Sequence, residues 1–201
     1  MPLYYYKYHI KLKEVFMTSF SINVKVTNFQ IKSVEPIYSN QTWTGQRILR
    51  STGIQYNQIS FTLNFNPTAL NEVNSFLAQY SQGKPFTLGL GIAGVYYGEQ
   101  TGALNANASA AKGTRIITTN PNQMAIGEMI QFTNHKKLYR IIDRTDTTLT
   151  IFPVLQNTVQ ASETIFYNNL IIEAVLDPDN DYTMPVGNIM NVNLKATENI
   201  V

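Results

Sequence analysis

The chain contains no cysteine in its 201 residues. This absence excludes disulfide bonds, thiolate metal sites and cysteine nucleophiles, and it leaves the cellular compartment open. Histidine is also scarce, with only His9 and His135 present. A metal site needs several converging ligands, so two histidines far apart in the sequence give no basis for one.

Charged side chains are few as well. They make up 14% of the residues, whereas an average soluble protein has about 25%. The net charge is only +2, whereas a nucleic-acid-binding protein is expected to be strongly basic. No apolar run approaches the length of a membrane span. Asn, Gln, Ser and Thr stand in place of the missing charged residues. Such a surface is suited to contacts with neighbouring subunits, because few charged groups have to lose their hydration when it is covered.

The first 16 residues, MPLYYYKYHIKLKEVF, leave two interpretations open. They lack the apolar stretch and the small-residue cleavage site of a signal peptide. Lys13-Glu14-Val15 can be encoded by a ribosome-binding sequence just upstream of Met17, in which case residues 1–16 are a leader outside the protein. Alternatively, the stretch belongs to the protein, and its four tyrosines form a strand-prone arm that adds to a neighbour's sheet, or it is a disordered leader.

Period-2 alternation of apolar residues predicts strands early in the chain. The first runs through FSINVKVTNFQIKSV, and its phase flips near Thr27-Asn28, which predicts a bulge there. The stretches at 41–51 and 54–65 are predicted to form the next two strands, joined around Ser51-Thr52-Gly53.

A helix is predicted over about 67–82. Asn66 can cap it, Pro67 suits the first turn, and Gly83 followed by Pro85 ends it. Its apolar residues share one face, which should pack on the sheet: Leu70, Val73, Phe76, Leu77 and Tyr80.

The composition then changes. GALNANASAAKG, at 102–113, is small and polar and indicates a loop or boundary. Five short strands follow and fit a small barrel of the OB-fold kind, after which two longer strands can rejoin the first sheet. We therefore predict a mainly β (α+β) protein. Its parts are an N-terminal arm or leader at 1–16, a β-sandwich or barrel-like base domain with one packed helix at 17–97 and 168–201, and an inserted OB-like barrel at 98–167.

IGEMIQFTNHKKLYRIIDRTDTTLTIFP, at 126–153, carries the densest cluster of charge. His135 is expected at the exposed tip of a hairpin, as a turn residue and not a catalyst. A positive patch is expected from Lys136, Lys137, Arg140 and Arg144. The alternative is an OB-type nucleic-acid-binding face, which needs stacking aromatics interleaved with these cations; the candidates are Phe132, Tyr139 and Tyr167.

Other motifs predict no chemistry. The aspartates of Asp177–Asp181 lack the glutamate and central glycine of a calcium loop and indicate a turn. GLGIAGVYYG, at 89–98, lacks the spacing and the following helix of a dinucleotide site, so we expect a loop with close backbone approach. We predict no catalytic, cofactor-binding or metal-binding residues and no enzymatic activity.

Two stretches carry a further signal. In the first part, a strand precedes TGQRILR, a strand centred on an aromatic (QYNQISFTL) and a short capped helix that ends at a glycine. In this order they resemble the base domain of distal tail proteins from long-tailed bacteriophages. The second part resembles the OB barrel inserted in the small version of that family, and the matching residues are Gly127, Glu128, Phe132, Leu138, Tyr139, Arg140, Phe152, Pro153 and Leu155.

The resemblance implies a structural role without catalysis. Such proteins form a hexameric ring that joins the tail tube to the tail tip or baseplate hub and leaves a channel through which DNA passes as cargo. The implied location is the virion, after synthesis in the bacterial cytoplasm, with host-surface carbohydrate as a further partner of the insert and no membrane partner. The alternatives are a tail tube or other baseplate subunit, or an OB-type module that binds oligosaccharide or nucleic acid.

Overall fold

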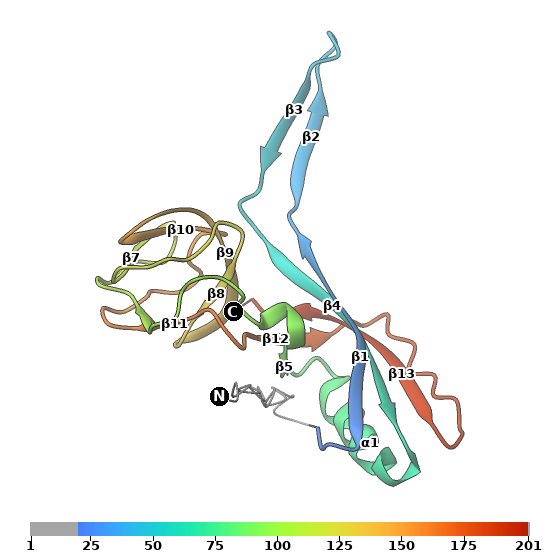
Figure 1. Cartoon of the computed structure of the whole chain (residues 1–201). Coiled ribbons are helices and arrows are strands. Elements are labelled where there is room, and N and C mark those ends of the chain that lie inside the picture. Colours follow the sequence, from blue (N-terminus) through green and yellow to red (C-terminus); the bar gives the residue numbers. More distant parts are fainter. Residues whose placement is uncertain (1–19, 201) are drawn as a thin grey trace, which may run out of the picture.

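Strands dominate the structure (Figure 1), a computed structural model that describes residues 20–200. Residues 1–16, predicted as an arm or leader, lie outside the described residues. The base contains a five-stranded antiparallel sheet in the order β1-β4-β13-β12-β5. Its strands are β1 (Val24–Val34), β4 (Tyr56–Phe65), β5 (Phe86–Gly89), β12 (Ile171–Leu176) and β13 (Met190–Glu198). The prediction that the two late strands rejoin the first sheet is confirmed.

The predicted bulge in the first strand is also confirmed. The pairing of β1 with β4 shifts register between Thr27 and Gln30. Asn28 has a positive φ of 50°, a conformation that asparagine adopts more readily than most residues. The extra residue turns the apolar side chains after it back toward the core, which accounts for the flip in the sequence pattern.

One α-helix, α1 (Leu70–Tyr80), follows the 3-10 turn η1 (Pro67–Ala69). The Asn66 side chain accepts a hydrogen bond from the Thr68 backbone N–H at 3.1 Å, so the predicted cap forms. Phe76 is buried, and its ring lies 5.3 Å from that of Phe86 in the sheet. The helix therefore closes the core of the base, as its apolar stripe predicted.

The second sheet is built from strands between residues 104 and 166, in the order β6-β11-β8-β9-β10-β7. Its edges meet, because Ala106 bridges Thr119 and the Asn107 N–H donates to the Thr118 carbonyl at 2.8 Å. The sheet thus curls into a small barrel. Its strands are β6 (Leu104–Asn105), β7 (Ile116–Thr118), β8 (Met129–Phe132), β9 (His135–Thr145), β10 (Thr148–Phe152) and β11 (Thr164–Phe166).

The polar stretch at 102–113 is more than a loop or boundary. Leu104, Ala106 and Ala110 are buried in the barrel, and β6 starts inside this stretch. The stretch is itself part of the barrel, and its small side chains fit into the barrel core, which a composition-based loop prediction cannot detect. The barrel and the base also share a core residue, because Leu138 of β9 belongs to the base cluster.

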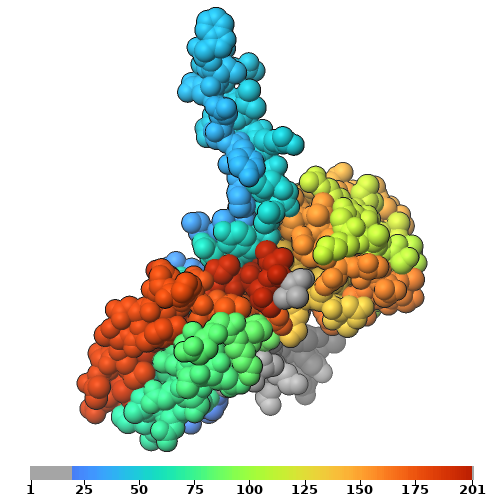
Figure 2. Space-filling view, turned by 180° about the vertical axis from the view of Figure 1, so that it is seen from behind, coloured from blue at the N-terminus to red at the C-terminus, as the bar shows by residue number. Residues whose placement is uncertain are grey.

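A two-stranded arm rises from the base, formed by β2 (Ile37–Gln41) and β3 (Arg47–Ser51). It continues beyond β1 and β4 and stands clear of the rest of the molecule (Figures 1 and 2). The predicted single strand at 41–51 is wrong, since residues 42–46 form the tip of a hairpin. Gly45 has a φ of +88°, which provides the reversal that the sequence pattern did not signal.

Candidate functional site

The arm has an ordered tip. The Thr42 N–H donates to the Gln46 carbonyl at 2.9 Å, and the Gly45 N–H donates to the Thr42 carbonyl at 2.9 Å. These bonds hold Trp43, the chain's single tryptophan, at the end of the arm with 98% of its surface exposed. A large aromatic side chain is thereby presented to whatever lies beyond the arm.

Both faces of the arm carry exposed apolar side chains. Residues directly opposite in an antiparallel pair share a face. One face therefore has Ile37 and Leu49, and the other has Tyr38 and Ile48. Each face also carries one arginine. An isolated two-stranded hairpin of this kind is only marginally stable in water. An apolar ribbon of this kind marks an interaction surface.

The base sheet presents a polar face opposite α1. Along β4 the buried Ile59, Phe61 and Leu63 alternate with polar residues, and the Thr62 hydroxyl donates to Asn193 Oδ1 of β13 at 2.7 Å. A groove of about 730 Å³ separates this face from the loop at 177–189. The polar residues of the two central strands on this face are Gln58, Ser60, Thr62, Asn64, Asn191, Asn193, Lys195 and Thr197.

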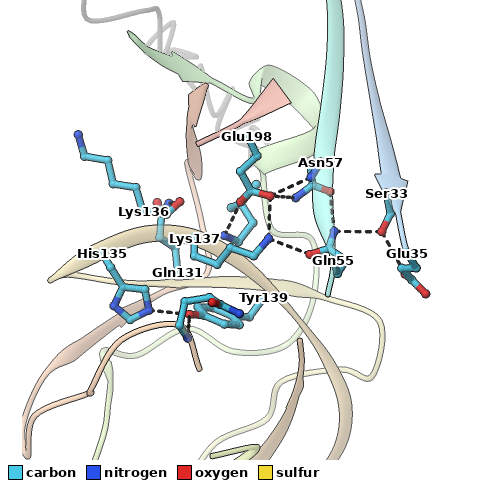
Figure 3. Close-up of polar contacts among 12 residues, drawn as sticks. Ser33, Glu35, Gln55, Asn57, Gln131, His135, Lys136, Lys137, Tyr139 and Glu198 are labelled. Atoms are coloured by element: carbon cyan, nitrogen blue, oxygen red, sulfur yellow. Dashed lines mark hydrogen bonds and ion pairs between the residues drawn. The ribbon is translucent and has the colours of Figure 1, made fainter. Parts of the chain in front are cut away.

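A buried ion pair joins the barrel to the base (Figure 3). Lys137 Nζ of β9 lies 2.7 Å from Glu198 Oε2 of β13, and their side chains are only 4% and 1% exposed. Glu198 also accepts from the Asn57 side-chain amide at 2.9 Å and from the Leu138 N–H at 3.1 Å. Because every charged atom has partners, the cost of burying this pair is offset, and the pair links the barrel to the sheet.

The same network reaches the root of the arm. Lys137 Nζ donates to Gln55 Oε1 at 2.8 Å, and Gln55 Nε2 donates to the Ser33 hydroxyl at 3.0 Å (Figure 3). Burial lowers the pKa of Lys137, while the attraction of Glu198 opposes that shift. Barrel and base sheet are therefore connected through one set of hydrogen bonds, which extends to Ser33 near the start of the arm.

The expectation of an exposed His135 is wrong. Thr133 and Asn134 alone form the turn, and His135 begins β9 as a buried residue. Its ring stacks on Phe132 with centroids 5.3 Å apart, and Nε2 lies 2.8 Å from the Tyr139 hydroxyl. The aromatic neighbours on both strands shield the imidazole from solvent.

The hydrogen bonds of this buried pair allow an arrangement in which Tyr139 donates to His135. The Tyr139 hydroxyl accepts from the Gln156 N–H at 2.9 Å, so its own proton is free to go to His135 Nε2. Nδ1 of His135 then carries the imidazole proton, and within residues 20–200 it has no hydrogen-bond partner. Burial lowers the pKa of His135, against the attraction of Glu163, and burial raises the pKa of Tyr139.

The expected positive patch is incomplete. Lys136, Arg140 and Arg144 are exposed, but Lys137 is committed to Glu198. Of the candidate stacking aromatics, Phe132 and Tyr139 are fully buried, and the Tyr167 ring packs on Tyr96 with centroids 4.9 Å apart. The two buried rings cannot stack on bases in this fold, which weakens the nucleic-acid alternative.

The two remaining motifs form as expected. Asn180 donates its N–H to the Asp177 carbonyl at 3.3 Å, so Asp177–Asp181 is a turn. Within the predicted loop at 89–98 the structure forms the short 3-10 helix η2 (Gly91–Gly94). At Gly94 a side chain would meet the Leu170 carbonyl oxygen at 2.9 Å, which is the close backbone approach predicted there. In residues 20–200 no group of three or more acidic or histidine side chains is arranged to hold a metal ion.

Comparison with protein-family models gave no match, and comparison with curated proteins gave none. Within the described part of the chain, no helix has the length and apolar character needed to span a membrane. Functional inference for this protein therefore rests on its surfaces. Of these, the arm is the feature that its own chain leaves least covered.

Proposed function

We propose that the protein is a structural subunit of a bacteriophage tail, which forms a ring at the distal end of the tail tube and joins the tube to the tail tip. The resemblance of its sequence to distal tail proteins motivates this function. The observation that carries it is the arm, an extended ribbon with apolar residues on both faces and a tryptophan at its tip.

The physical argument concerns solvent exposure. Fully burying one large apolar side chain contributes about 1.5–3 kcal/mol. The arm leaves Ile37, Tyr38, Trp43, Ile48 and Leu49 in water. Assembly with other subunits would recover part of this free energy. An adaptor has to contact both its own copies and a different protein, and a ribbon with two apolar faces can serve both contacts.

The polar face of the base sheet supports a channel. DNA can pass through a channel only if the channel wall does not bind it tightly. The affinity for DNA grows with the number of cations that neutralise its phosphates. On this face β4 contributes only the uncharged Gln58, Ser60, Thr62 and Asn64. The neighbouring strands add three lysines, Lys25, Lys32 and Lys195, of which Lys195 is paired with Asp179. In this proposal the polar face lines the channel. The tail tube contacts one rim of the ring and the hub contacts the other. No residue is proposed to be catalytic.

Two measurements on the purified protein test the proposal. Light scattering gives the mass in solution, and negative-stain electron microscopy should show rings with a central hole. An open stack of rings would indicate a tube subunit instead. A protein that stays monomeric at concentrations up to the millimolar range would contradict assembly altogether.

A variant without the arm sharpens the test. Residues 38–50 are replaced by two glycines, which removes the exposed ribbon and leaves the sheet intact. We expect a folded monomer with nearly unchanged melting temperature. The matched control is Ile126→Ser, which removes an exposed apolar side chain from the barrel and should leave assembly intact. Trp43 fluorescence in the intact chain should shift to the blue on assembly, because the tip becomes buried.

A further inference from the structure

The loop at 177–189 is a second exposed surface with apolar side chains. It joins β12 to β13 without regular secondary structure. Tyr182, Val186 and Ile189 are exposed, with Val186 94% accessible. Three aspartates and no basic residue lie in the loop. It is therefore an acidic surface with apolar anchors.

The arm has the opposite charge. Residues 37–51 include Arg47 and Arg50 and no acidic residue. The arginines lie on different faces of the ribbon, since Arg47 pairs with Gln41 and Arg50 pairs with Tyr38. Each face thus offers a cation beside apolar side chains, which complements the acidic apolar loop.

Within one copy the two surfaces lie apart. The arm points away from the base, while the loop runs beside β13 (Figure 1). We propose that the arm of one copy docks on the 177–189 loop of the next copy. A contact between two different surfaces of identical chains is head-to-tail, and such contacts generate closed rings when the rotation closes. This inference rests on the proposed function, whose ring it would connect.

Local partners decide which aspartates are available. Asp179 lies 3.2 Å from Lys195, and both side chains are largely exposed, so Arg47 or Arg50 could replace the lysine at little cost. Asp181 accepts from the Thr183 hydroxyl at 2.6 Å and has no cationic partner in residues 20–200. Asp177 accepts from Thr197 and stabilises the turn, so it is left out of the test.

The test is a charge-exchange experiment on the full chain. One variant carries Arg47→Glu and Arg50→Glu, and another carries Asp179→Lys and Asp181→Lys. Each alone should weaken self-association about a hundredfold or more, because like charges then meet. Mixing the two variants should restore assemblies, since every arm then meets a loop of opposite charge. Sedimentation velocity at low and high salt measures the masses.

A matched control for the arm variant carries Lys112→Glu and Arg115→Glu on the barrel, which gives the same change in net charge as Arg47→Glu with Arg50→Glu and should assemble normally. Single reversals of Arg47 and Arg50 show which face of the arm docks. If the wild-type protein assembles and the arm variant does so equally well, or if mixing restores nothing, the inference is overturned and the proposed ring stands. A wild-type protein that never assembles overturns both.

Discussion

Two hairpins of this protein carry charged and aromatic residues, and these side chains are buried in one hairpin and exposed in the other. In the β8–β9 hairpin, His135, Lys137 and Tyr139 are buried and hydrogen-bonded. In the β2–β3 arm every strand residue is exposed. The difference lies in the neighbours, because β9 packs against the base and the arm has only itself.

The comparison shows that one side-chain type can have two roles. A lysine in the barrel hairpin fixes an orientation through a buried carboxylate, whereas an arginine in the arm stays available to a partner. Stability and assembly are therefore expected to separate between the two hairpins. Substitutions in β8–β9 should change the free energy of unfolding, and substitutions in the arm should change association.

The largest expected effect comes from the buried ion pair. Lys137→Met removes one partner and leaves Glu198 charged and buried, so it should lower the free energy of unfolding by about 3–5 kcal/mol. Lys136→Met is the control, because its side chain is 45% exposed and lies 3.5 Å from Glu173; it should change stability by about 0.5 kcal/mol or less. Urea denaturation compares the two variants, and equal losses would contradict the burial of Lys137.

A smaller effect is expected from a matched pair of tyrosines. Tyr139→Phe deletes the hydroxyl that accepts from Gln156 and contacts His135, which should cost about 1–3 kcal/mol because buried polar groups lose their partner. Tyr38→Phe makes the same change in the exposed arm and should leave stability unaltered. Thermal melts distinguish them, and a stable Tyr139→Phe protein would show that the hydroxyl network is dispensable.

The smallest effect concerns pH. Burial lowers the pKa of His135 below its ordinary 6.5. The unfolded chain then takes up a proton near pH 6.5 and the folded chain only at lower pH, so stability is full above pH 6.5 and falls as the pH decreases through this interval. His135→Gln should fall less between pH 7.5 and 5.5 than the wild type. Identical pH dependence of the two melting temperatures would rule out the contribution of His135.

Much of the fold could be predicted because its signals are local. Asn66 and Pro67 mark the start of the helix and Gly83 marks its end, each within a few residues of the boundary, and the phase flip at Thr27-Asn28 indicates the bulge directly. The short strands of the barrel also follow from their own alternation and turn residues. These features depend on neighbours in the sequence.

The errors concern long-range partners. Lys137 is buried because Glu198, 61 residues later, supplies its counter-charge. Nothing near Lys137 in the sequence indicates that pairing, so it was assigned to a solvent-exposed patch. The arm was missed for a different reason: Thr42–Gln46 lacks the Asn-Gly or Asp-Gly pair that signals a tight hairpin turn. The exposure of its apolar residues is a property of the whole fold.

The position of β13 has a consequence for the order in which the molecule is completed. This strand lies between β4 and β12, and its residues come after the whole barrel in the sequence. During synthesis from the N-terminus, β4 therefore keeps one unpaired edge while the helix and the barrel are being made. Contacts between distant segments form slowly. The barrel can fold from segments that the ribosome has already released, whereas the base sheet cannot be completed until β13 has been synthesised. A ribosome that pauses before β13 would leave β4 open to the nascent chains of neighbouring ribosomes.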